Sequence, residues 1–313
     1  MVTEFTLGFA LATLSALSWA LLDITRKKLG REMSAVGAVA GLMLLHILFI
    51  NPVLLAGSIT ETPDSVAGAM ILGGYPSLAT SYFPPAFFSI LLNLAANFLF
   101  LRAVQISPLS LTIPYLAFTP VFTAITALIF IGQSPSTAGA LGILIVCLGA
   151  FFLNRGDDGG GLFAPVKALW TERGSLFMLI VALIWSVTPI LDKNAADQTS
   201  PLFHTMFLAA GIGVIFTAIA LGRDRSLIPL IKEFKKLPLW LCLGGLFAVG
   251  AMLFQLSSYA YIDVAYVETV KRGIGVTAAM IAGYFLFGER DILRRLVAAF
   301  VMVIGVALIL IAG

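Results

Sequence analysis

Long apolar runs separated by short clusters of charge constrain this chain more than any other feature of its sequence. The runs are about 18 to 23 residues long, the length at which a helix rising about 1.5 Å per residue crosses a hydrocarbon core of roughly 30 Å. Because 60% of the residues are hydrophobic and 11% are charged, a water-soluble globule could not cover its apolar surface. The sequence therefore predicts an all-α membrane protein, since helices satisfy their backbone hydrogen bonds in lipid and open strands do not.

Ten transmembrane helices are expected from these runs. Their approximate ranges are 5–22, 35–57, 84–104, 109–131, 137–153, 174–191, 201–221, 238–259, 265–287 and 294–312. A polar stretch with three successive glycines divides them into two sets of five. We therefore expect a first five-helix repeat at 1–153, a connector at 154–173 and a second five-helix repeat at 174–313.

The two halves are similar to each other in sequence. Ala16 to Trp19 aligns with Ala182 to Trp185, and Gly132 to Ser134 aligns with Gly288 to Arg290. Because five is an odd number of crossings, the second copy must be inverted relative to the first. Inverted repeats are the architecture of alternating-access carriers, which hold their substrate where the repeats meet.

Lysine and arginine lie almost entirely on one side of the expected topology. Sixteen of the 19 fall in loops or at helix ends on that side, Lys193 stands on the other, and Lys271 and Arg272 lie inside the ninth helix. The positive-inside rule then places the basic loops in the cytoplasm and both termini outside it.

These features resemble the drug/metabolite transporter superfamily, and within it the bacterial EamA-type transporters. The resemblance covers essentially the whole chain, and rests on the Ala-Leu-Xaa-Trp segments at Ala16 and Ala182, the run 265–290 and its final turn 288–290. It implies ten helices in two inverted repeats, a central cavity lined mainly by helices three, four, eight and nine, and transport by alternating access. The family's usual topology puts both termini in the cytoplasm, whereas the charges of this chain put them outside.

A second resemblance is local to the ninth helix. Val270-Lys271-Arg272 is similar to the Lys-Arg pair with which plastid phosphate translocators hold the phosphate of their substrates. Their additional basic ligand has no counterpart that we can locate in this sequence. The resemblance therefore supports an anionic substrate and leaves a phosphorylated one in doubt.

Charges inside the ninth helix need a physical reason, because each costs about 2.5 to 3.5 kcal/mol to insert. Glu268 precedes Lys271 by three residues and Arg272 by four, so it shares a helix face with both. An internal ion pair is one explanation, and snorkelling of the cations toward the outer interface is another. One carboxylate cannot neutralise two cations, so we favour recognition of an anionic ligand above a groove of small residues, Gly275, Ala279 and Gly283.

Polar side chains on the other cavity helices complete the candidate substrate site. They lie on helices three, four and eight: Asn93, Asn97, Thr112, Tyr115, Thr119 and Gln255. The repeat alignment places Tyr115 opposite Arg272. The three amides bind substrate or hydrogen-bond neighbouring helices, and both interpretations stay open. Three prolines are expected to bend the fourth helix: Pro108, Pro114 and Pro120.

Other polar residues receive simpler interpretations. His46 and His204 are expected to be packed or locally hydrogen-bonded. Asp192 lies near a helix end, where Lys193 can pair with it. The cysteines, which are Cys147 and Cys242, are expected to be buried small hydrophobes that form neither a disulfide nor a metal site.

Several function classes lack the residues they require. The sequence has no His-Glu-Xaa-Xaa-His, no nucleophile elbow and no pair of mid-span aspartates, which argues against an enzyme. No ATP-binding motif occurs, so gradients or exchange must drive transport. Neither a cofactor nor a metal is implied. The basic residues lie at helix ends, which excludes a nucleic-acid partner, and a receptor or scaffold would be expected to show a soluble domain.

The sequence thus predicts a multi-pass inner (plasma) membrane protein whose partners are the lipid bilayer and a small-molecule substrate. We expect a secondary-active transporter of a small, anionic organic metabolite. The alternatives are an exporter of amino acids or drug-like compounds and a flippase for lipid-linked substrates. Substrate, direction, coupling ion and oligomeric state, a homodimer included, stay open.

Overall fold

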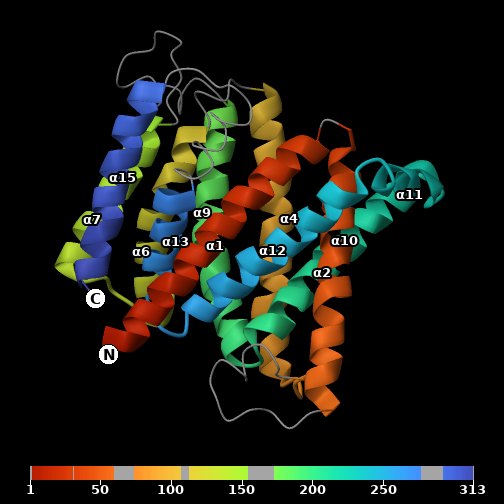
Figure 1. Cartoon of the computed structure of the whole chain (residues 1–313), viewed down its shortest axis with the longest axis horizontal. Helices are drawn as coiled ribbons and strands as arrows, with labels where there is room; N and C mark the ends of the chain where they lie inside the picture. The colour runs from red at the N-terminus through yellow and green to blue at the C-terminus, as the bar shows by residue number, and fades with distance from the viewer. Residues whose placement is uncertain are drawn as a thin grey trace. The chain divides into compact units, whose positions relative to one another are not determined.

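The computed structural model describes residues 2–30, 32–59, 74–106, 113–153, 173–275 and 292–312. Every regular element in these ranges is helical, which confirms the all-α class (Figure 1). The longer helices are α1 (Val2–Leu29), α2 (Ala35–Ile59), α4 (Phe83–Ile106), α6 (Thr119–Ile131), α7 (Thr137–Leu153), α9 (Arg173–Asp197), α10 (Pro201–Asp224), α12 (Pro238–Ser258) and α15 (Ile292–Ala312). The shorter elements are η1 (Thr80–Tyr82), η2 (Ile113–Phe118), α11 (Ile228–Phe234), α13 (Val264–Val270) and η3 (Lys271–Gly275).

Six helices of the described ranges are long and apolar enough to cross a membrane, and they lie in α1, α2, α4, α9, α10 and α12. Three shorter apolar helices, Tyr115–Ile131, Thr137–Phe151 and Phe300–Ile309, coincide with the fourth, fifth and tenth expected spans. A multi-pass architecture is therefore supported. The full count of ten spans stays a prediction, because the ninth expected span continues into 276–291, outside the described residues.

The fourth expected helix, 109–131, is not a single α-helix. Its described part begins with the 3-10 element η2 and becomes α-helical only at Thr119. Pro114 lies in η2 and Pro120 in the first turn of α6, and neither can donate a backbone hydrogen bond. The expected bend therefore takes the form of a change of helix type. Pro108 lies outside the described residues.

The ninth expected helix also changes type. It is α-helical over α13, and continues as a π-helical turn in η3, which begins at Lys271. π turns inside helices are rare and frequently occur at functional sites. The small residues Ala279 and Gly283, and the turn Gly288 to Arg290, lie outside the described residues.

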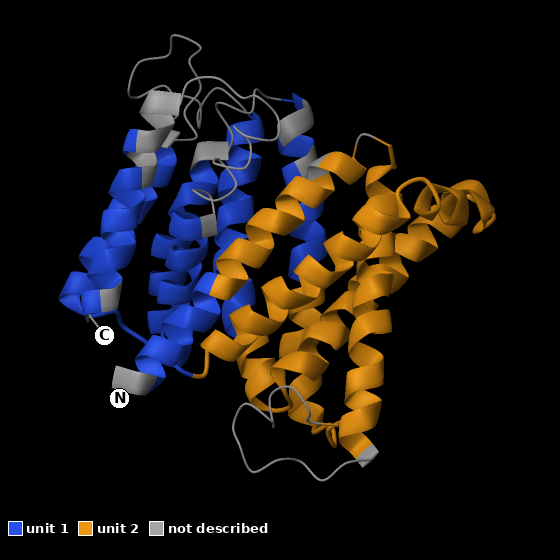
Figure 2. Cartoon of the chain, in the orientation of Figure 1, with its two compact units in different colours: residues 1–13, 91–191, 261–313 blue, residues 14–90, 192–260 orange. Residues whose placement is uncertain are grey.

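The chain forms two compact units that do not follow the division of the sequence into halves (Figure 2). Unit 1 comprises residues 1–13, 91–191 and 261–313, and unit 2 comprises residues 14–90 and 192–260. Each unit therefore combines helices from the first and second halves of the chain.

In unit 1, α15 packs along α7 in the most extensive contact between two elements, and α13 packs on α6. The helices α7 and α15 approach closely at Gly142 and Gly305, where a Cβ on either residue would meet the backbone oxygen of the other at 2.6 and 2.8 Å. Small residues at helix contacts are characteristic of membrane proteins, because they let two backbones come together. A separate apolar cluster joins η2 to α4 and α9 around Tyr115 and Met178.

In unit 2, α2 packs along α10 and also against α12. The pairs α2 with α10, α6 with α13 and α7 with α15 share one property. Each joins helices that occupy the same position in the two expected repeats.

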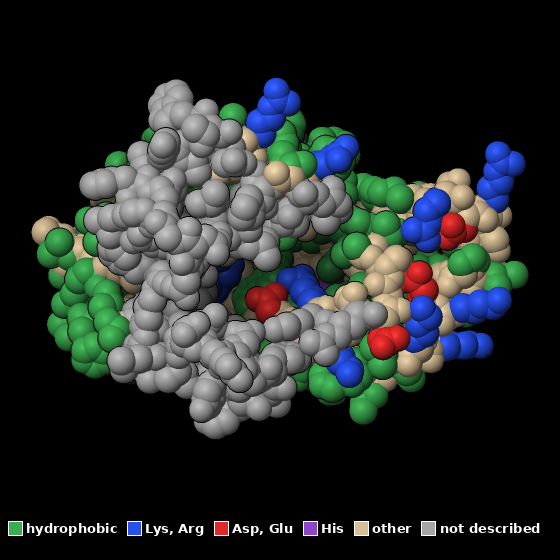
Figure 3. Space-filling model, turned by 90° about the horizontal axis from the view of Figure 1, so that it is seen from above, with side chains coloured by type: hydrophobic (Ala, Val, Ile, Leu, Met, Phe, Trp, Pro, Cys, Tyr) green, Lys and Arg blue, Asp and Glu red, His purple; other side chains and the backbone are tan. Residues whose placement is uncertain are grey.

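One end of unit 2, around α11, carries the most basic loop of the described chain. Its cations are Arg223, Arg225, Lys232, Lys235 and Lys236, and Figure 3 shows basic side chains with acidic ones among them at this end. Glu233 fastens α11 to the start of α2, because its Oε2 accepts hydrogen bonds from the backbone N–H of Ser34 at 3.1 Å and from its hydroxyl at 2.9 Å. Lys236 adds a second contact, because its Nζ donates to the carbonyl oxygen of Glu32 at 2.8 Å.

The cysteines are both free. Cys147 is buried, as expected. Cys242 is exposed on α12, and the expectation that it would be buried is wrong. An apolar run in a membrane helix does not distinguish a face that packs on protein from one that faces lipid.

Candidate functional site

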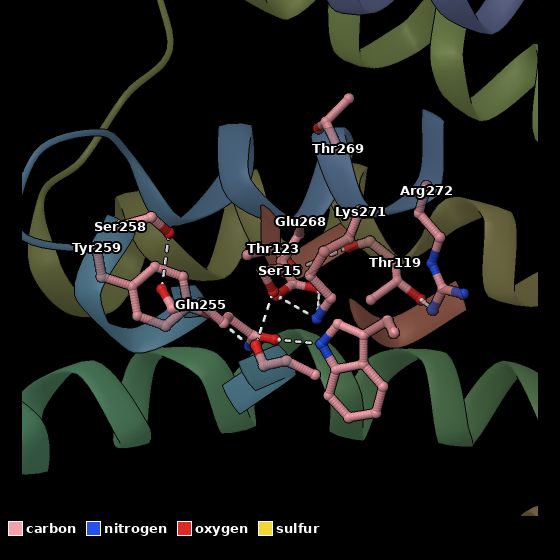
Figure 4. Close-up of polar contacts among 12 residues, drawn as sticks. Ser15, Thr119, Thr123, Gln255, Ser258, Tyr259, Glu268, Thr269, Lys271 and Arg272 are labelled. Carbon is pink, nitrogen blue, oxygen red and sulfur yellow. Dashed lines mark hydrogen bonds and ion pairs between the residues drawn. The ribbon is translucent and has the colours of Figure 1, made fainter. Parts of the chain in front are cut away.

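The acid and the first cation of the ninth helix form a close ion pair in unit 1 (Figure 4). Lys271 donates from Nζ to Oε1 of Glu268 at 2.9 Å and to Oε2 at 3.0 Å. The side chain of Glu268 is 4% exposed and that of Lys271 is 18% exposed. Burial of a carboxylate is costly unless a cation and hydrogen bonds compensate it. The internal ion pair considered from the sequence is therefore present for Lys271.

Arg272 points to a neutral partner on α6. Its Nη2 lies 3.4 Å from the hydroxyl oxygen of Thr119, which itself donates to the carbonyl oxygen of Leu116 at 2.8 Å. Thr123 lies one turn further along α6 and is fully buried, like Thr119. A hydrogen bond to a hydroxyl leaves the formal charge of a guanidinium in place. The site therefore combines a paired ammonium, a charged guanidinium and a threonine face in one part of unit 1 (Figure 4).

The start of α13 is fastened to the turn between α6 and α7. Gln133 accepts a hydrogen bond from the backbone N–H of Val264 at 3.2 Å, and the phenol oxygen of Tyr266 accepts one from the backbone N–H of Ser136 at 2.9 Å. Gly132 ends α6 with a positive φ of 69°, a conformation that glycine adopts without strain. The Gly-Gln-Ser segment, found from the sequence as a repeat signal, thus positions the helix that carries the charges.

The other candidate substrate-site residues from the first half of the chain lie in unit 1, and each has its own surroundings. Tyr115 is 3% exposed, packs between α4 and α9, and hydrogen-bonds the side chain of Ser175. Asn97 is exposed and donates from its amide to the carbonyl oxygen of Asn93 at 2.6 Å, within its own helix. Thr112 lies outside the described residues. A substrate contact for these residues stays a prediction.

Gln255 belongs to unit 2, and its side chain is part of a hydrogen-bonded network there. It donates to the phenol oxygen of Tyr259 at 2.6 Å and accepts from the indole of Trp19 at 3.0 Å (Figure 4). The structure therefore shows Gln255 linking α12 to α1, the helix-to-helix use of a buried amide. Trp19, interpreted from the sequence as a packing residue, is also a hydrogen-bond donor.

A buried polar chain in unit 2 was not predicted from the sequence. His204 lies 3.3 Å from Asp192 through Nε2 and 3.0 Å from the hydroxyl of Tyr82 through Nδ1. Lys193 pairs with Asp197 at 2.8 Å, so the expected pairing of Asp192 with Lys193 is wrong. The signal in the sequence was an acid and a histidine on either side of the same interhelical turn.

Three comparisons relate the chain to known proteins. The model of the EamA-like transporter family matches residues 6–155 and again residues 172–311. No curated protein matches the chain. A solved structure titled "Crystal structure of protein" is similar with a TM-score of 0.68 at 15% identity, over 98% of this chain and 96% of that chain. At this identity the structural likeness concerns the fold.

Proposed function

Because the chain belongs to the EamA-like transporter family, whose members are membrane transporters of small molecules rather than enzymes, we propose a specific role within it. The protein is a secondary-active transporter that moves a small anionic organic metabolite across the inner (plasma) membrane by alternating access.

The observation that carries this proposal is the pair of adjacent cations in the π-helical turn. Keeping two cations in an apolar helix costs on the order of 5 to 7 kcal/mol on the lenient insertion scale. Glu268 directs both carboxylate oxygens to Lys271, while Arg272 contacts the hydroxyl of Thr119. A guanidinium binds a carboxylate or phosphate through two parallel hydrogen bonds, and an ammonium adds a point charge. An oxyanion suits this arrangement better than a neutral sugar does.

Alternating access is supported by the repeated family match and by helix packing. The family model matches the chain twice, at 6–155 and at 172–311. Helices in equivalent positions of the two segments pack in pairs, as α7 does with α15 and α2 with α10. Inverted repeats of this kind give carriers two related conformations around one site.

An exporter of amino acids is the second candidate, and Glu268 favours it. A zwitterion would present a carboxylate to Arg272 and an ammonium group to the acid that now pairs with Lys271. The two candidates share the anionic group and differ in whether Glu268 contacts the substrate.

A thermal-shift measurement on the purified protein tests the proposed function. The probes are inorganic phosphate, succinate and glutamate, with tetraphenylphosphonium as a cationic control, followed by a panel of a few hundred metabolites. A ligand that binds only the folded state stabilises it by about 2.7 kcal/mol at 100 times its Kd. We expect anions to raise the unfolding temperature and the cation to leave it unchanged. Stabilisation by cations alone would contradict the proposal.

A second experiment tests the orientation of the protein in the membrane, since the basic loop around α11 is expected in the cytoplasm. Single cysteines at Ser65 and Ser226, in a background without the exposed Cys242, report the two sides. In intact spheroplasts an impermeant maleimide should label the cysteine at Ser65 and spare the one at Ser226. Permeabilised cells, in which both must react, are the control. The reverse pattern would show that both termini are cytoplasmic.

A further inference from the structure

Asp192, His204 and Tyr82 form a continuous hydrogen-bonded chain in the interior of unit 2. The three residues come from α9, α10 and η1, and their exposed fractions are 4%, 0% and 0%. Nε2 of His204 faces a carboxylate oxygen of Asp192 at 3.3 Å, and Nδ1 faces the phenol oxygen of Tyr82 at 3.0 Å. Both ring nitrogens of the imidazole are therefore engaged, each by a group of different chemistry.

The surroundings of this chain are apolar. A buried cluster of α2, η1, α4, α9 and α10 side chains packs around Tyr82, and it consists of Ile50, Leu54, Ala86, Ala195, Leu202 and Phe203. Few other titratable groups of the described residues lie near Asp192, His204 and Tyr82. Lys193 pairs with Asp197 on α9, and Tyr75 lies edge-on to Phe203 with its hydroxyl on Asn51. Within the part of the chain that the structure describes, His204 is the basic partner of Asp192.

The protonation states of such a chain follow from its donors and acceptors. A neutral imidazole donates from Nε2 to ionised Asp192 and accepts the hydroxyl proton of Tyr82 at Nδ1. All contacts are then satisfied, but one negative charge is buried. Adding one proton makes both ring nitrogens donors and the Asp192–His204 pair electrically neutral.

We propose that Asp192 and His204, with Tyr82, form a proton-binding site that takes up and releases one proton as a coupled pair. Buried ionisable residues in membrane helices commonly mark proton relays. The reaction is the transfer of one proton from water to the pair and back. The proton resides between the carboxylate and the imidazole, and Tyr82 reverses the direction of its hydrogen bond when Nδ1 becomes a donor.

A rim of polar side chains surrounds the end of α9 beside this site. Gln198 hydrogen-bonds Asn194 at 2.9 Å and Ser81 at 2.6 Å, and Ser81 directly precedes Tyr82. These rim contacts are exposed, whereas the acid and the histidine are buried. The exposed polar contacts thus lie at the turn where α9 ends and α10 begins, close in the chain to the buried pair.

Use of this proton as the coupling ion rests on the proposed function, whereas the proton-binding site rests on the geometry alone. A carrier without an ATP site needs a gradient or an exchange partner. A buried pair that changes its proton occupancy supplies the link to a proton gradient.

Nuclear magnetic resonance of histidine labelled with ¹³C and ¹⁵N tests the site without any substrate. The chain has two histidines, and a His204→Gln variant assigns their signals. We expect the signals of His204 to change with pH as the pair takes up and releases its proton. Asp192→Asn should abolish or displace this change, because it removes the carboxylate that shares the proton. Asp197→Asn, on the exposed acid of the same helix, should leave it unchanged.

The outcomes of this experiment separate the two inferences. If His204 in the unmodified protein keeps one protonation state over the whole pH range in which the protein stays folded, the proton-binding site is wrong, whether or not the variants fold. An Asp192→Asn titration equal to that of the unmodified protein would also overturn it. The coupling role is tested in proteoliposomes with a trapped pH dye and whichever probe stabilises the protein. Transport that carries no protons contradicts coupling, and failure to transport any probe contradicts the proposed function while the titration still decides the site.

Discussion

Replacing Arg272 with Gln should weaken anion binding by roughly 10- to 150-fold and leave the protein folded. Charge-assisted hydrogen bonds contribute about 1.5 to 3 kcal/mol each, and every 1.4 kcal/mol is a factor of ten in Kd. The folded state should survive, because glutamine keeps a side-chain donor that can reach the hydroxyl of Thr119, which Arg272 contacts at 3.4 Å. Binding of the stabilising anion by calorimetry, together with size-exclusion chromatography, gives both quantities.

Lys271→Gln should also lower anion affinity, with an additional effect on stability. It removes the ammonium that pairs with the carboxylate of Glu268, which is 4% exposed. Breaking a buried pair in this way costs about 3 to 5 kcal/mol. Glu268→Gln should instead raise the affinity for the anion, because it removes the negative charge beside the two cations. The double variant Glu268→Gln/Lys271→Gln removes both charges of the buried pair. It therefore separates the effect of Lys271 on stability from its effect on anion affinity.

Full anion affinity in both Arg272→Gln and Lys271→Gln would contradict the anion site. The two cations would then serve the structure of the helix alone. A cationic ligand would lead to the same conclusion. If Glu268→Gln instead abolishes binding of an amino acid, the second candidate function is favoured.

Gly142→Val should strongly destabilise unit 1. A Cβ at this position would meet the backbone oxygen of Gly305 at 2.6 Å and Cγ1 of Ile309 at 2.8 Å. Overpacking typically costs about 1 to 3 kcal/mol, and more where neighbours cannot move. A backbone oxygen inside a helix can move only if α15 moves away from α7. We therefore expect a large drop in unfolding temperature and loss of the monodisperse protein.

Gly222→Val is the matched control for this change. Gly222 lies in α10, and a Cβ there meets nothing within 4 Å. The same side chain is added to a glycine of an apolar helix, so the comparison isolates the contact between α7 and α15. Equal unfolding temperatures for the two variants would show that this close approach is not required for stability.

The helical spans were predictable because they depend on local composition. The structure places α2 at Ala35–Ile59 and α10 at Pro201–Asp224, within a few residues of the expected ranges. The changes of helix type were harder to predict. The prolines indicated a bend before Thr119. The pattern of side chains contains no signal that distinguishes the π turn at Lys271 from an α turn.

The candidate site was predictable where its contacts are local. The spacing of Glu268 and Lys271 indicated an ion pair as one explanation of these charges, and the pair is present within one helix turn. The contact between Arg272 and Thr119 joins residues 153 positions apart; the sequence proposed both residues without indicating that they meet. Tyr82 and His204 are 122 positions apart, and their association depends on how η1 and α10 pack, which no local pattern contains.

The π-helical turn determines how its helix can change shape. A π turn closes its hydrogen bonds over five residues instead of four, so it holds one residue more than an α turn. Conversion of η3 to α geometry would therefore rotate α13, which precedes the turn, by about 100° relative to the last residue of the turn. Glu268 lies before the turn, and Lys271 and Arg272 open it. A register slip of one hydrogen bond would thus turn the acid of α13 away from its present direction and shift it along the helix axis by about 1.5 Å.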